Sequence, residues 1–167
     1  NIAGLPTWFT IRANHRGYIA RKKEIDLLVA MNAETAREDA LGMRPGTTVV
    51  YDEPLKLNAL RDDVNFYPVP FDKIVADVCP DAKLRKLVKN MIYDGVLSHI
   101  LSIDIDEMEK ALNKQLGKKP KAMALNLGAL KAGRDWAAAN VPASDKYKVQ
   151  RLDRKSTRLN SSHTDIS

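Results

Sequence analysis

An apolar run from Leu27 to Met31, with Ile25 just ahead of it, ends at the polar Asn32. Apolar residues on both faces of an extended segment are typical of a strand buried between two layers. The following segment, Ala33–Leu41, has a helical pattern. The strand and the helix together predict the first half of a β-α-β unit.

Two further strands are predicted downstream. Thr47–Tyr51 is rich in β-branched residues, and Val64–Pro70 is an apolar stretch that its two prolines end. Between them, Leu55–Leu60 forms a short helix or a loop. Strands that alternate with crossover segments predict a mostly parallel sheet with helices on both faces.

The N-terminal segment predicts a hairpin. Trp8–Arg12 and Tyr18–Arg21 have the composition of short strands, and the connection Asn14–Gly17 has that of a turn. In this arrangement Gly17 supplies the positive φ that the turn needs.

After Pro70 the pattern becomes helical. Phe71–Val78 predicts one helix, and Pro80-Asp81 opens a second, amphipathic one. The apolar stripe of this second helix contains Leu84, Leu87, Val88, Met91, Ile92, Gly95, Val96, His99 and Ile100. We expect Gly95 to let another backbone come close, and His99 to be packed or hydrogen-bonded.

Two more helices complete the helical part. Asp104 and Glu107 resemble a capping box that opens one helix, which Gly117 ends. The other runs from about Pro120 to Asn140, ahead of Pro142. The prediction is an α/β domain over residues 1–142. Residues 1–78 form its sheet part, and residues 80–142 form a C-terminal helical subdomain.

Composition excludes several classes of protein. The 167 residues are 44% hydrophobic and 29% charged, as in an ordinary globular domain. No run approaches the roughly 18 apolar residues of a membrane span, and no signal peptide is recognisable. The single cysteine, Cys79, excludes an internal disulfide and favours the cytoplasm; we expect it to be a small buried residue.

The C-terminal residues 153–167 have neither an apolar periodicity nor a sequence typical of turns. Residues 153–163 read DRKSTRLNSSH, which resembles the translation of a common DNA sequencing adapter. We therefore expect 153–167 to be a disordered artefact and residues 143–152 to be a linker into a further domain.

Motifs that identify a chemistry are few. Neither glycine-rich phosphate-binding pattern occurs, and one cysteine permits no paired-cysteine metal site. We therefore predict no catalytic and no metal-binding residue. Asp52, Asp62 and Asp63 are loop carboxylates without an identifiable partner. The net charge of +6 and the lack of interleaved aromatic residues argue against a nucleic-acid platform.

Two N-terminal features have alternative interpretations. The first feature is the segment of Gly4, Leu5, Pro6, Thr7 and Trp8. One interpretation is that it serves a site or an interface; the other is that it begins a strand whose tryptophan lies in the core. A basic cluster surrounds the predicted hairpin, either as a solvated strand edge or as a site for an anion or an acidic partner. The cluster consists of Arg12, His15, Arg16, Arg21, Lys22 and Lys23.

Six segments together resemble one known module, the gamma (catalytic-type) domain of 2-oxoacid:ferredoxin oxidoreductases. More narrowly, they resemble the form fused to the N-terminus of the alpha subunit in 2-oxoglutarate:acceptor enzymes. The segments are GLPTWFTIRAN (Gly4–Asn14), GYIARKKEIDLLVAMN (Gly17–Asn32), YDEPLK (Tyr51–Lys56), FYPVPFDKI (Phe66–Ile74), KNMIYDGVLSHILSIDID (Lys89–Asp106) and LNLGALKAGRDWA (Leu125–Ala137).

The resemblance implies an enzyme that oxidatively decarboxylates a 2-oxoacid, with 2-oxoglutarate favoured. Such enzymes use thiamine diphosphate with Mg²⁺, pass electrons through [4Fe-4S] clusters to ferredoxin, and transfer the acyl group to coenzyme A. The expected partners are an alpha domain and a thiamine-binding beta subunit. The family's opening strand and its alpha domain are missing from this sequence. The chain alone is therefore expected to be inactive and to bind none of these cofactors.

The resemblance and the strand ends together suggest where a site lies. Gly4–Trp8 and the loop with Pro70 and Phe71 are expected near the shared active site, because open α/β sheets bind ligands at strand ends. Arg12, Arg16 and Lys22 are expected to bind coenzyme A phosphates or an acidic subunit surface. A dinucleotide-binding dehydrogenase domain and a non-catalytic assembly scaffold remain as alternatives.

Overall fold

The computed structural model describes residues 6–18, 20, 22–142 and 146–150. Gly4, Leu5, two residues of the predicted hairpin (Ile19 and Arg21) and the expected adapter-derived tail lie outside these residues. No helix in the described part of the chain is long and apolar enough to span a membrane.

Three strands form a parallel sheet in the order β1-β2-β3. Their bounds are β1 Leu27–Ala30, β2 Thr48–Asp52 and β3 Asn65–Val69. This confirms the predicted α/β class and the three core strands. One detail differs: Pro68 lies inside β3 and does not end it. An edge strand tolerates this proline, because the ladder needs no N–H there.

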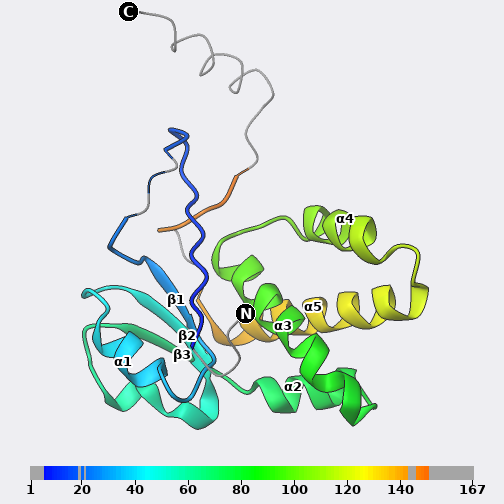
Figure 1. Ribbon diagram of the computed structural model, residues 1–167, viewed down its shortest axis with the longest axis horizontal. Coiled ribbons are helices and arrows are strands. Elements are labelled where there is room, and N and C mark those ends of the chain that lie inside the picture. Colours follow the sequence, from blue (N-terminus) through cyan, green and yellow to red (C-terminus); the bar gives the residue numbers. More distant parts are fainter. Residues whose placement is uncertain (1–5, 19, 21, 143–145, 151–167) are drawn as a thin grey trace, which may run out of the picture.

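Helices cover both faces of the sheet (Figure 1). On one face, α1 (Ala36–Leu41) and the two 3₁₀ turns Glu53–Leu55 and Leu57–Ala59 pack against Val49 and Tyr51. The other face, with Val50 and Val69, is covered by α2 (Phe71–Val78), α3 (Ala82–Ile100) and α5 (Pro120–Asn140). The fourth helix, α4 (Ile105–Leu116), lies against α5.

The helix ends follow from local chemistry. Asp81 caps α3 by accepting the amide of Lys83 at 2.9 Å, and Asp104 caps α4 through the amide of Asp106 at 2.9 Å. Phe71–Val78 has the bounds predicted for it, and α5 ends ahead of Pro142 as expected.

The predicted strand Trp8–Arg12 is wrong, although the turn that follows it is confirmed. No strand occurs among the described residues before Leu27, and the second predicted strand, Tyr18–Arg21, falls partly on Ile19 and Arg21, outside those residues. Side-chain hydrogen bonds hold the turn. The side-chain Oδ1 of Asn14 accepts hydrogen bonds from the backbone amides of Arg16 and Tyr18, each at 3.0 Å, and the Arg12 guanidinium donates to the carbonyl of Ala20. Gly17 has φ +72°.

The predicted burial of two α3 leucines is also wrong. Leu84 is 38% exposed and Leu87 is 70% exposed. Helix α5 crosses α3 further along, around Gly95, so it does not cover the N-terminal part of the stripe. The stripe is buried from Val88 onward, at Ile92, Val96 and Ile100.

Two glycines set the distance between α3 and α5, which confirms the expectation for Gly95. A Cβ added at Gly95 would lie 2.0 Å from the carbonyl oxygen of Leu130, and one at Gly133 would lie 2.1 Å from that of Ile92. Real Cβ atoms do not approach a backbone oxygen so closely. The two helices therefore pack backbone against backbone.

Replacing Gly95 by alanine should push α3 and α5 apart and lower the free energy of unfolding by about 1–3 kcal/mol or more. Gly128→Ala, on the partner helix α5, is the control, because a Cβ at Gly128 meets nothing within 4 Å. The control should be neutral or stabilising by up to about 1 kcal/mol. Urea denaturation of both variants measures this; equal stability would contradict the tight crossing.

Candidate functional site

The carboxyl ends of β2 and β3 lie side by side, since Asp52 is paired in register with Val69. Strand β3 runs directly into Pro70 and then into Phe71, the first residue of α2. In open parallel sheets this edge is where ligands bind.

A lysine from α3 joins these strand ends. Lys89 Nζ lies 2.7 Å from Asp52 Oδ2 and 2.9 Å from Asp72 Oδ1, and 5.9 Å from the centre of the Phe71 ring. Burial alone would lower the pKa of Lys89, but its hydrogen bonds to Asp52 and Asp72 outweigh this and raise the pKa above its usual value. Lys89 therefore stays charged and links β2, α2 and α3.

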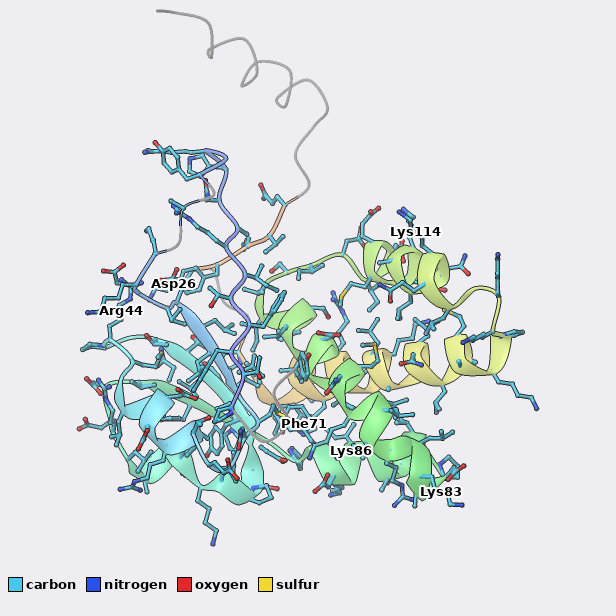
Figure 2. All side chains as sticks on the ribbon, in the orientation of Figure 1. Asp26, Arg44, Phe71, Lys83, Lys86 and Lys114 are labelled. Atoms are coloured by element: carbon cyan, nitrogen blue, oxygen red, sulfur yellow. The ribbon has the colours of Figure 1, made fainter. Side chains whose placement is uncertain are left out.

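A shallow groove of about 380 Å³ opens between α2 and α3 beside this cluster. Figure 2 shows Phe71 where the sheet meets the helices, with Lys83 and Lys86 along the N-terminal half of α3. Arg85 is held at the groove by two backbone carbonyls, with Nε 2.9 Å from Cys79 O and Nη2 3.4 Å from Pro80 O. The groove is lined by Asp72, Val75, Ala82, Arg85, Lys86 and Lys89.

Three basic side chains line this groove, but Lys89 is paired with Asp52 and Asp72, and Arg85 donates to backbone carbonyls. In the part of the chain that the structure describes, no three His, Cys, Asp or Glu side chains are close enough to hold a metal ion. Cys79 is buried, as expected, and its thiol lies 3.3 Å from the carbonyl of Asp81. His99 is hydrogen-bonded, as expected, with Nε2 3.0 Å from the carbonyl of Val141.

The two segments predicted to approach an active site lie on different faces of the sheet. Phe71 is fully buried in the core on the α2 and α3 side, so it can act only through packing. Pro70 is half-buried. Trp8 is bound to α1 on the other face, where its indole Nε1 donates to both carboxylate oxygens of Asp39 at 3.1 Å.

The core-tryptophan interpretation is wrong, because Trp8 is 60% exposed. Pro6 is half-buried and Thr7 is exposed. The site or interface interpretation of this segment remains a hypothesis.

The predicted anion-binding residues have different surroundings. The Arg12 guanidinium lies 5.8 Å from the centre of the Tyr18 ring and donates to a backbone carbonyl. Arg12 therefore braces the N-terminal turn. Arg16 and Lys22 are exposed at the surface.

Two of the carboxylates that had no identifiable partner have one in the structure. Asp52 forms an ion pair with Lys89. Asp63 forms a bidentate ion pair with Arg61, in which both N–O distances are 2.7 Å. Sequence reasoning missed Lys89 and Arg85 as site residues. In the sequence, the only sign that Asp52 belongs to a site is its position at the end of a buried strand. Lys89 lies 37 residues further along the chain, so no local pattern connects the two residues.

Comparison with known proteins identifies the family. Residues 1–136 match the family described as pyruvate ferredoxin/flavodoxin oxidoreductase. The chain belongs to this family. The match confirms the resemblance found in the sequence, and it lies within the predicted domain 1–142.

A solved structure of this oxidoreductase type shares the fold. It is 2-oxoglutarate:ferredoxin oxidoreductase from Magnetococcus marinus with 2-oxoglutarate, coenzyme A and succinyl-CoA bound. The TM-score is 0.67 and the sequence identity 27%, over 78% of this chain. The present chain spans 23% of that chain's length. No curated protein sequence matches this one.

The pKa of the Asp94 carboxyl group is raised. Asp94 is half-buried on α3, and burial raises its pKa from 3.8 to about 6. Perturbed carboxyl groups occur at functional sites and also inside purely structural cores.

Replacing Lys89 by methionine should lower the free energy of unfolding by about 2–3 kcal/mol. Asp52 Oδ1 is already buried without a partner among the described residues, and the substitution would deprive Oδ2 of Lys89 as well. Lys86→Met, at an exposed position in the same groove, is the control and should change stability by less than about 0.5 kcal/mol. Equal effects in urea denaturation would contradict a structural role for the Lys89 cluster.

The raised pKa of Asp94 predicts a pH dependence of stability. Between the unfolded value of 3.8 and the folded value of about 6, the native state binds more protons than the unfolded state. Stability should therefore fall as the pH rises through this window. Asp94→Asn should be more stable than the wild type at about pH 7 and similar to it near pH 4. Urea midpoints at both values measure this, with the exposed Asp135→Asn as control; a difference independent of pH would contradict the assignment.

Proposed function

We propose that the chain is the gamma-type domain of a 2-oxoacid:ferredoxin oxidoreductase and does not catalyse the reaction alone. The observation that carries the proposal is the family match over residues 1–136. A second support is the 27% sequence identity to a 2-oxoglutarate:ferredoxin oxidoreductase. The present chain covers 23% of the length of that protein chain, as expected for one domain of it.

The proposed reaction is the oxidative decarboxylation of a 2-oxoacid. The acyl group goes to coenzyme A and the electrons go to ferredoxin. The substrate is proposed to be 2-oxoglutarate, because the solved structure that matches was determined with this acid bound. The family resemblance adds thiamine diphosphate, Mg²⁺ and [4Fe-4S] clusters to the assembled enzyme.

The residues of this chain do not fit those metal-containing groups. An iron–sulfur cluster needs several thiolate ligands, and Cys79 is the single cysteine of the sequence. The described residues also contain no cluster of three candidate metal ligands. We therefore assign the clusters and the thiamine site to partner components, namely an alpha domain reached through residues 143–152 and a thiamine-binding beta subunit. The lone cysteine favours the cytoplasm.

Two parts of the chain are proposed to serve the assembled enzyme. We propose that the Pro70–Phe71 junction lies near the shared active site, since it follows the carboxyl end of β3. The segment that contains Pro6, Thr7 and Trp8, on the other face of the sheet, is proposed to serve this site or an interface. Arg16 and Lys22, with Arg12 as a brace, supply positive charge for coenzyme A phosphates or an acidic subunit surface.

The assembled enzyme should reduce ferredoxin, or a viologen dye, only when both a 2-oxoacid and coenzyme A are present. The chain alone should show no such activity. In the same assay, Pro6→Ala should lower turnover without preventing assembly; unchanged turnover would remove Pro6 from the site. Two outcomes would contradict the proposed function. One is that the chain alone reduces NAD; the other is that the assembled protein does not reduce ferredoxin or the dye when a 2-oxoacid is added.

A further inference from the structure

The helical hairpin of α4 and α5 carries a run of positive charge. From Lys110 to Arg134 the chain contains seven basic residues and no aspartate or glutamate. The net charge of the whole chain, by comparison, is +6. Four of the basic residues lie within eight positions where α4 ends and α5 begins, and they are here called the lysine tip. The lysine tip consists of Lys114, Lys118, Lys119 and Lys121.

The charges of the lysine tip are not neutralised within the described part of the chain. All four side chains are exposed. None of them forms an ion pair with a carboxylate of the described residues. The carboxylates of α4, Asp106, Glu107 and Glu109, lie in the other half of that helix. Glu107 and Glu109 are moreover paired with Lys110 and Lys131. The four ammonium groups are therefore available to a partner.

The lysine tip stands on an ordered backbone. The amide of Gly117 donates to the carbonyl of Asn113 at 2.8 Å, and that of Lys119 donates to the carbonyl of Leu116 at 2.7 Å. Figure 1 shows the connection of α4 and α5 at the end of the helical part that lies away from the sheet, and Figure 2 shows Lys114 on α4 there. The hairpin thus presents its lysines on a projecting, fixed turn.

This surface has charge but no apolar centre. Residues 105–140 all belong to the described part, and no large hydrophobic side chain among them is exposed. The exposed residues between the lysines are Gln115, Gly117 and Pro120. Stable protein interfaces have an apolar centre, whereas transient encounters between redox proteins are small and depend on complementary charge. The lysine tip therefore fits a partner that binds and leaves quickly.

Two other anionic partners fit this surface less well. Proteins that hold single-stranded nucleic acid stack its bases on aromatic side chains. The one aromatic residue between positions 105 and 140 is Trp136, which is half-buried and lies near the other end of α5. An anionic membrane holds a basic segment stably only with a second, apolar anchor, and the exposed side chains of the hairpin include no large apolar one. An acidic protein remains.

The reaction under the proposed function has a protein substrate of this kind. The carboxylate of the 2-oxoacid leaves as carbon dioxide, and the acyl carbon bonds to the sulfur of coenzyme A, which releases two electrons and one proton. A carrier that accepts one electron at a time must bind and leave twice in each turnover. Opposite charges raise the rate of such encounters by about 10- to 1,000-fold.

We propose that the lysine tip is the docking surface for the small acidic protein that accepts the electrons. This inference rests on the proposed function and adds to it the part of this chain that attracts the electron acceptor. The iron–sulfur clusters are assigned to partner components, so the lysine tip supplies attraction and orientation and no electron path.

The test uses the enzyme assembled from its full-length components, a ferredoxin of net negative charge, and a viologen dye. Lys118→Glu combined with Lys119→Glu should lower kcat/KM for the ferredoxin about tenfold or more in about 0.1 M salt, because it replaces attraction by repulsion. The loss should shrink in about 0.5 M salt, which screens exposed charges. The kcat with saturating dye and the KM values for the 2-oxoacid and coenzyme A should not change.

Two further variants make the test specific. Lys73→Glu combined with Lys83→Glu is the matched control, because it makes the same change in charge at exposed positions of α2 and α3. Its kcat/KM for the ferredoxin should stay within about twofold of the wild-type value, since salt screens charges beyond about 10 Å. Lys118→Gln combined with Lys119→Gln removes the charges without reversing them and should give an intermediate loss.

Three outcomes would overturn the inference. The first is that the tip variants react with the ferredoxin like the wild type; if wild-type enzyme then binds phosphatidylserine vesicles and the glutamate variant does not, a membrane is the occupant. The second is an equal loss in the matched control. The third is a parallel loss of dye reduction, which would give the lysines a role in assembly or chemistry. Normal dye reduction with tip-independent ferredoxin kinetics refutes this inference alone, whereas an assembled protein that reduces no dye with any 2-oxoacid refutes the proposed function.

Discussion

The close crossing of α3 and α5 is the contact on which the rest of the structure depends. Gly95 and Gly133 let each helix backbone touch a carbonyl of the other. This contact holds α3 and α5 together as one layer, and the apolar residues of that layer cover Val50 and Val69 of the sheet. A side chain at either glycine would separate the helices and open the larger of the two cores.

Lys89 connects this helical layer to the carboxyl edge of the sheet. Its ammonium group bridges Asp52 at the end of β2 and Asp72 in the first turn of α2. Strand ends, α2 and α3 are thereby fixed relative to one another, and the groove beside them keeps its shape. The edge where α/β proteins bind ligands is therefore ordered by charge as well as by packing.

Sequence reasoning succeeded where the local pattern decides the structure. Strand β1 follows from its apolar run, α2 from its helical pattern, and the close approach at Gly95 from a glycine on an apolar stripe. It failed where a distant partner decides. Leu87 has the spacing of a core residue, but its burial depends on where α5 crosses. The Asp52–Lys89 pair joins residues 37 positions apart, which no local pattern reveals. The family itself was recognisable, because several motifs match at once.

The central claim is our proposal that this chain is one domain of a larger oxidoreductase. Hydroxyl-radical footprinting read by mass spectrometry, on the chain alone and on the assembled enzyme, tests it most directly. The account predicts that a set of exposed side chains of this domain becomes protected on assembly. Equal reactivity of all its exposed side chains in the two states would contradict the account.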